Sequence, residues 1–171
     1  MHFEVYGPFV LPRGGRHVLR SALDRRAYWE SVDDKVPGLS AACGCYVFTV
    51  RGKVWYVGLA ERQTFKNECY IPHKVLAYNE ALQIVSGTCS LIFIPKITLK
   101  GRFARPTVGK IKAVQLLEDM LLGLAISRNP KLTNIKGTKF PKNMVVPGII
   151  NTPQGTARSL SVQALKKALG V

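Results

Sequence analysis

Long apolar runs are absent from this sequence, and cysteines are few. No run approaches the roughly 20 apolar residues of a membrane-spanning helix, so we expect no contact with the membrane interior. The opening MHFEVYGPF lacks the charged start and apolar core of a signal peptide, and there are only four cysteines. Both features favour a cytoplasmic protein. Because 47% of the 171 residues are hydrophobic, we expect one domain, residues 1–171, that folds without disulfides.

Acidic side chains are also scarce. Ten Asp and Glu stand against 25 Lys and Arg, which gives a formal net charge of +15. The cations are spread over the chain and are not gathered in one tail. Such a charge favours a polyanionic partner, most often nucleic acid, with an anionic membrane surface as the lesser possibility.

The hydrophobic pattern predicts an α/β (α+β) domain with a small three-stranded antiparallel sheet flanked by helices. Residues 44–50 and 53–58 are β-rich and are separated by Arg51-Gly52, which predicts a hairpin. Residues 89–99 predict a third strand, which Pro95 should confine to an edge or a bulge. The helical patterns cover residues 21–34, 61–82 with an interruption at Pro72, 110–128 and 161–171.

Glu118 breaks the apolar pattern of the third predicted helix. It lies within the arc defined by Val114, Leu121 and Ala125, whereas its neighbour Asp119 points to solvent. A carboxylate on an apolar stripe is costly unless it is paired, hydrogen-bonded or bound to a metal. Two interpretations stay open: a partly exposed or structurally paired carboxylate, and a functional carboxylate that faces a cleft.

The order of these parts resembles the GIY-YIG nucleases. That family has a G-x-Y strand, a Y-V-G strand, a helix with a basic residue, a third strand and a helix with a glutamate. The resemblance covers residues 43–134 and leaves residues 1–42 and 135–171 as extensions. The matching positions are Gly44-Cys45-Tyr46, Tyr56-Val57-Gly58, Lys66 with Tyr70 four residues later, Glu118, Pro130 and, in a structural role, Asn134.

The resemblance implies a metal-dependent nuclease, with DNA favoured over RNA as substrate. Glu118 would hold Mg²⁺ or Mn²⁺, hard ions that prefer oxygen ligands. Tyr46 would orient or deprotonate the attacking water, and Tyr56 would place a second hydroxyl beside it. Lys66 would neutralise the phosphate, although the family has arginine there. His73 would carry a proton.

Further residues are candidates for binding the nucleic acid. Lys74 and Arg62 compete with Lys66 for the phosphate, and Gly44 and Gly58 would either admit the substrate backbone or allow a bulge and a turn. Cations along the backbone of the polymer would neutralise successive phosphates. The expected binding set is Gly44, Gly58, Tyr70, Lys74, Lys96, Lys100, Arg102, Arg105 and Lys110.

Two other functions stay open from the sequence. The lysine at position 66 allows a weak or inactive nucleic-acid-binding protein that keeps the fold, with Tyr46 and Tyr56 as ordinary strand residues at the rim of the core. Cys43, Cys45, Cys69 and His73 are zinc-ligand types and allow a zinc-stabilised interaction domain.

Overall fold

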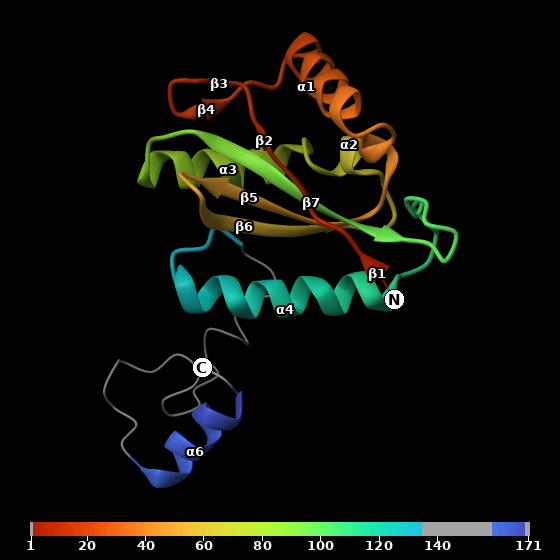
Figure 1. Cartoon of the computed structure of the whole chain (residues 1–171). Helices are drawn as coiled ribbons and strands as arrows, with labels where there is room; N and C mark the ends of the chain where they lie inside the picture. Colours follow the sequence, from red (N-terminus) through yellow and green to blue (C-terminus); the bar gives the residue numbers. More distant parts are fainter. Residues whose placement is uncertain (1, 135–158, 170–171) are drawn as a thin grey trace.

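The computed structural model describes residues 2–134 and 159–169, and it confirms a mixed α/β fold with a mostly antiparallel sheet flanked by helices (Figure 1). Residues 135–158 of the expected C-terminal extension lie outside the described residues. The elements discussed below are β1 (His2–Phe3), β2 (Tyr6–Val10), α1 (Ala22–Lys35), β5 (Gly44–Val50), β6 (Lys53–Ala60), α2 (Phe65–Glu68), α3 (Pro72–Ile84), β7 (Cys89–Ile97), α4 (Lys112–Arg128) and α6 (Leu160–Leu169). A separate hairpin is formed by β3 (Arg13–Gly14) and β4 (His17–Val18).

The sheet has five strands where the sequence predicted three. The predicted strands form its centre in the order β7-β5-β6, and β1 and β2 from the N-terminal extension pair with the other side of β7. The β5–β6 hairpin turns at Arg51 and Gly52, whose φ angles of 51° and 74° suit a tight two-residue turn. Residues 2–10 therefore extend the sheet rather than standing outside it.

The prediction that Pro95 marks an edge or a bulge is wrong, because β7 is an interior strand. Pro95 pairs with Gly44 on one side. On the other side, β1 pairs with Lys96 and Ile97, and the partners of β2 end at Phe93. Glu4, between β1 and β2, donates its N–H to Pro95 O at 3.4 Å, and Pro95, which has no N–H, returns no bond.

Alternation along the strands divides the core into two layers. Tyr46 and Phe48 of β5 belong to the larger cluster, which α1, α2 and α3 cover with buried residues such as Trp29. Val47 of β5 faces the opposite side and packs in the cluster with Leu122 of α4. The sheet therefore lies between α4 on one face and α1, α2 and α3 on the other (Figure 1).

The helices follow the predicted pattern with local differences. The predicted helix 61–82 is divided into α2 and α3, and Pro72 is the first residue of α3, where its missing N–H is tolerated. In α4 the buried line runs through Val114 and Leu122, and Glu118 occupies the position between them. Leu124 of the same helix is 67% exposed.

Short segments after α4 cover the outer edge of β6. The Asn134 side chain accepts a hydrogen bond from Val57 N at 2.9 Å and donates one to Val57 O at 2.6 Å. Asn129 Nδ2 donates to Val54 O at 2.7 Å. The Asn134 side chain thus bonds the N–H and C=O of Val57 on the edge strand β6, as a neighbouring strand would. Among the described residues, no helix is long and apolar enough to span a bilayer.

We expect Gly58→Ala to destabilise the domain. A Cβ on Gly58 would lie 2.5 Å from Cζ of Tyr46, inside the packed core, so the free energy of unfolding should fall by about 1–3 kcal/mol. Gly123→Ala is the control, because that helical position is open and the change should raise stability by up to about 1 kcal/mol. Urea unfolding measures both variants, and equal effects would show that the Tyr46 contact does not matter.

Candidate active site

Lys74 connects β6 to the helices that cover it. It lies in the first turn of α3, and its Nζ donates a hydrogen bond to the Tyr56 hydroxyl at 2.6 Å. The same nitrogen is 3.6 Å from Glu68 Oε1 at the end of α2. Burial lowers the pKa of Lys74, but Tyr56, Glu68 and Glu118 together outweigh burial and raise it. Lys74 is therefore a fixed positive charge beside a tyrosine hydroxyl.

Glu118 lies on α4 within electrostatic reach of this pair. Burial raises the pKa of Glu118 to about 7, and the charges of Asp119, Glu61 and Glu68 add to the rise, whereas Lys74 opposes it. Within the described part of the chain, the Glu118 carboxylate has no hydrogen bond and no ion pair within 4 Å. The structural pairing considered from the sequence is therefore not formed by the described residues.

Glu61, which sequence reasoning missed, fixes the start of α4. It is 8% exposed and directly follows β6. Its Oε2 accepts a hydrogen bond from Ile111 N at 2.8 Å, and its Oε1 accepts one from Gln115 Nε2 at 3.1 Å. Ile111 is the N-cap residue of α4, so the carboxylate replaces a side-chain cap and complements the helix dipole. The sequence offers no signal for this role, because the partners are 50 and 54 residues away.

Tyr46 is not placed as a catalytic base in this structure. It is fully buried, and its hydroxyl makes no hydrogen bond of normal geometry with any described residue. Burial raises the pKa of Tyr46 well above its ordinary value, which is opposite to what proton abstraction needs. Its ring is stacked near that of Tyr56 at a centroid distance of 6.3 Å. The interpretation of Tyr46 as a core residue therefore replaces the catalytic one.

The motif glycines have packing roles in the sheet. Gly58 is the cross-strand partner of Tyr46, whose ring occupies the space that a side chain would need. A Cβ on Gly44 would lie 2.2 Å from Ile94 O, so Gly44 permits the close pairing of β5 with β7. The Tyr46 ring accounts for Gly58, and the close pairing of β5 with β7 accounts for Gly44.

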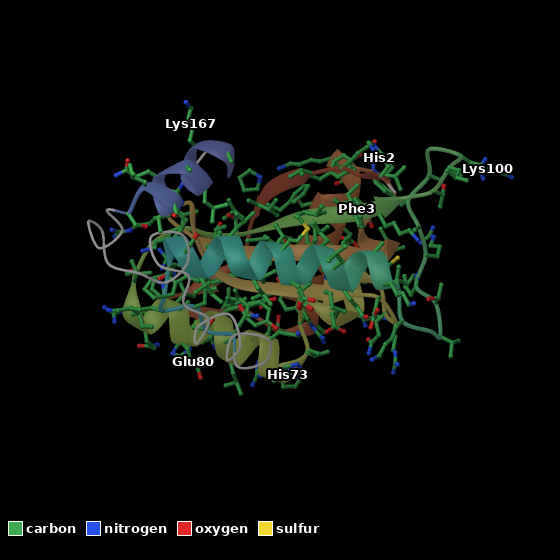
Figure 2. All side chains as sticks on the ribbon, turned by 90° about the horizontal axis from the view of Figure 1, so that it is seen from below. His2, Phe3, His73, Glu80, Lys100 and Lys167 are labelled. Carbon is green, nitrogen blue, oxygen red and sulfur yellow. The ribbon has the colours of Figure 1, made fainter. Side chains whose placement is uncertain are left out.

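The other predicted catalytic and binding residues on α2 and α3 separate into exposed and buried groups. Lys66 and His73 are exposed, and Figure 2 shows His73 on the outer side of the helix layer. Tyr70 is 7% exposed and packs edge-on against Tyr28 and Trp29, which corrects its assignment as a nucleic-acid ligand. Lys74, rather than Lys66, is the cation that the structure brings to Tyr56 and Glu118.

The predicted binding cations lie mainly on the connection between β7 and α4. Lys96 is half-buried, and Lys100 extends from one end of the molecule (Figure 2). The Nη1 atom of Arg105 donates to Ala41 O at 3.0 Å, and this bond anchors the connection. The exposed members of the set are Lys100, Arg102, Arg105 and Lys110. They form a basic surface on the segment that leads into α4, whereas the carboxylates gather around Lys74.

The structure places two residues of the zinc hypothesis, Cys45 and Cys69, on opposite faces of the sheet. Cys45 Sγ donates to Val114 O on the α4 side at 3.3 Å, whereas Cys69 belongs to the cluster on the opposite side. Cys43 is buried and His73 is exposed. Among the described residues, no three His, Cys, Asp or Glu side chains form a metal-binding group. A divalent ion here would depend on Glu118 and on oxygen atoms from water and substrate.

Comparisons of the chain with protein-family models, with curated proteins and with solved structures found no match. The resemblance to GIY-YIG nucleases stays a prediction from the motifs.

We expect Lys74→Met to raise the pKa of Glu118 above its value of about 7, because the opposing positive charge is removed. Carboxyl ¹³C NMR titration of the metal-free protein measures this pKa directly. Lys66→Met is the matched control, since Lys66 is exposed on α2 and should leave the titration unchanged. Equal shifts in both variants would contradict the assignment of Lys74.

Proposed function

We propose that this protein is a metal-dependent nuclease, with DNA as the favoured substrate, and that its active site lies around Glu118, Lys74 and Tyr56. The observation that carries the proposal is the half-buried Glu118 carboxylate, which no described residue pairs although burial penalises its charge. A structural carboxylate at such a position would be bonded. An unbonded oxygen ligand is suited to a hard divalent cation.

The site residues have separable roles in this proposal. Glu118 would hold Mg²⁺ or Mn²⁺, which when bound would neutralise the phosphate and the leaving oxygen. Lys74 takes the role first assigned to Lys66 and provides the fixed charge that attracts the phosphate. Tyr56, held by Lys74 at 2.6 Å, would orient the attacking water through its hydroxyl. The basic connection at Lys100 and Arg102 would contact phosphates on either side.

A second candidate is a protein of the same shape that binds nucleic acid without cleaving it. The burial of Tyr46 favours this candidate, because it removes one of the two tyrosines that the resemblance places at the reacting phosphate. The two candidates share the basic surface and differ in turnover. Cleavage assays therefore separate them.

We expect Glu118→Gln to abolish cleavage of plasmid and single-stranded DNA in Mg²⁺ or Mn²⁺, with a loss of at least about 10²-fold, while binding is kept or strengthened. The amide cannot hold the ion, and one negative charge has left a site that receives phosphate. Glu80→Gln on the exposed face of α3 is the control and should cleave normally. Folding is checked by melting temperature.

Persistent cleavage by Glu118→Gln would exclude the proposed centre. If neither the unchanged protein nor Glu118→Gln cleaves DNA in Mg²⁺ or Mn²⁺ while both still bind it, the binding-only candidate is established. RNA substrates in the same assay would test the preference for DNA.

The pH profile follows from the raised pKa of Glu118. Only the ionised carboxylate holds the metal, so cleavage should rise about tenfold per pH unit below pH 7 and level off above it. The pKa of Glu118 is shifted upward because burial favours the protonated form of an acid. Lys74→Met should move the midpoint to higher pH, which residual activity measured from pH 5.5 to 9 would reveal. A flat profile would contradict the role of Glu118.

A further inference from the structure

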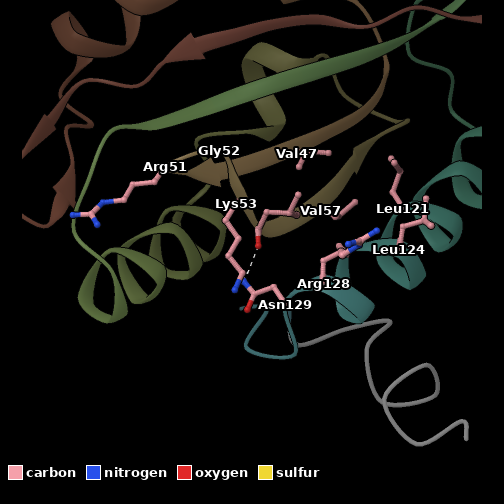
Figure 3. Close-up of a pocket in the computed structure, with 11 residues that line it drawn as sticks. Val47, Arg51, Gly52, Lys53, Val57, Leu121, Leu124, Arg128 and Asn129 are labelled. Atoms are coloured by element: carbon pink, nitrogen blue, oxygen red, sulfur yellow. Dashed lines mark hydrogen bonds between the residues drawn. The ribbon is translucent and has the colours of Figure 1, made fainter. Parts of the chain in front are cut away.

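An apolar groove lies between the β5–β6 hairpin and the C-terminal half of α4, on the face of the sheet opposite Tyr56 and Lys74 (Figure 3). Its volume is about 520 Å³, which is within the range of ligand sites. We call it the α4 groove, and its apolar lining is Val47, Val54, Val57, Leu121, Leu124 and Ala125.

Every charged residue that lines the α4 groove is a cation. Arg51 and Lys53 come from the turn and the start of β6, and Arg128 comes from the last turn of α4. All three side chains are exposed. Within the described part of the chain, none of them forms an ion pair within 4 Å. The groove therefore combines an apolar lining with positive charge that these residues leave uncompensated.

An exposed apolar stripe on α4 leads into this groove. Leu116, Met120 and Leu124 follow one another at intervals of four residues and therefore lie on one line of the helix. Their exposed fractions are 57%, 58% and 67%. The stripe extends over about 12 Å of the helix axis, so an occupant that covers both groove and stripe must be elongated.

We propose that the α4 groove is a docking site for an acidic amphipathic helix of a partner protein. The apolar side of that helix would fill the groove and cover the stripe, as in other complexes that lay a helix into a groove. Its Asp and Glu side chains would meet Lys53 and Arg128 at the rim, where opposite charges speed association and select the partner. This inference goes beyond the proposed nuclease activity and does not depend on it.

Shape and charge favour this occupant over others. Val57 lines the groove and is only 1% exposed, so a flat membrane surface would touch the rim and leave the lining uncovered. A second copy of the chain would bring the same excess of positive charge, +15 per chain, against the basic rim. Helix α6, with two lysines and no carboxylate in its sequence, has the same disadvantage.

Selection from a phage-displayed peptide library on the immobilised full chain tests the proposal. The library holds random peptides of about 16 residues, which is enough for about four helical turns. We expect the enriched peptides to be acidic and to carry apolar residues three or four positions apart, because this spacing places them on one side of a helix. Fluorescence anisotropy then measures the Kd of an enriched peptide.

Two variants of the groove should each weaken this peptide's binding at least about tenfold, Leu124→Ser and Arg128→Glu. Leu124→Ser keeps the net charge, so its loss of binding separates the groove from general attraction to a basic chain. The matched controls are Leu23→Ser and Arg25→Glu, at exposed positions of α1 across the sheet, and both should keep full affinity. Melting temperatures check that all four variants fold.

Several outcomes would overturn the inference. Enrichment of no peptide, or of neutral or basic peptides, would exclude an acidic helix as the occupant, and equal affinities of Leu124→Ser and Leu23→Ser would place the peptide elsewhere. A dimer in analytical ultracentrifugation that Leu124→Ser dissociates would assign the groove to a second copy. Binding to vesicles of mixed phosphatidylserine and phosphatidylcholine that Leu124→Ser abolishes would assign it to an anionic membrane.

Discussion

The hydrogen bonds of Glu61 are the constraint on which the geometry of the candidate site depends. This carboxylate follows β6 directly and bonds to Ile111 N and to the side chain of Gln115 at the start of α4. It thereby sets where α4 begins relative to the sheet. Glu118 lies one helical turn after Val114, whose carbonyl bonds to Cys45 on β5, so the same contacts fix the position of the candidate metal ligand.

Burial assigns different tasks to side chains that look equivalent in the sequence. Tyr46 and Tyr56 project from the same face of the hairpin, but Tyr46 lies in the central strand β5 and is enclosed by neighbours on all sides. Tyr56 lies in the edge strand β6, where Lys74 reaches its hydroxyl. Position in the sheet, which local alternation does not reveal, decides which tyrosine hydroxyl meets a charged partner.

The sequence was sufficient for the hairpin, for the division of the helix at Pro72 and for the unusual position of Glu118, because each depends on local periodicity or backbone chemistry. It was insufficient where distant segments meet. Lys66 was chosen from its place in the motif of the resembling family, and the sequence does not reveal which cation the separate helices α2 and α3 bring to Tyr56. Lys66 is exposed, and Lys74 is the cation at the site. The bonds of Glu61 and the pairing of residues 2–10 with β7 are equally non-local.

The carboxylates around Lys74 impose a condition on any polyanion that binds there. Glu61, Glu68 and Asp119 already raise the pKa of Glu118, and an incoming phosphate adds negative charge in the same low-dielectric region. Phosphate binding without a metal must therefore favour protonation of Glu118. A divalent ion has the opposite effect, because it requires the ionised carboxylate and cancels the repulsion of the phosphate. On the proposed function, metal and nucleic acid thus strengthen each other's binding, and the reciprocity of linkage makes that coupling equal in both directions.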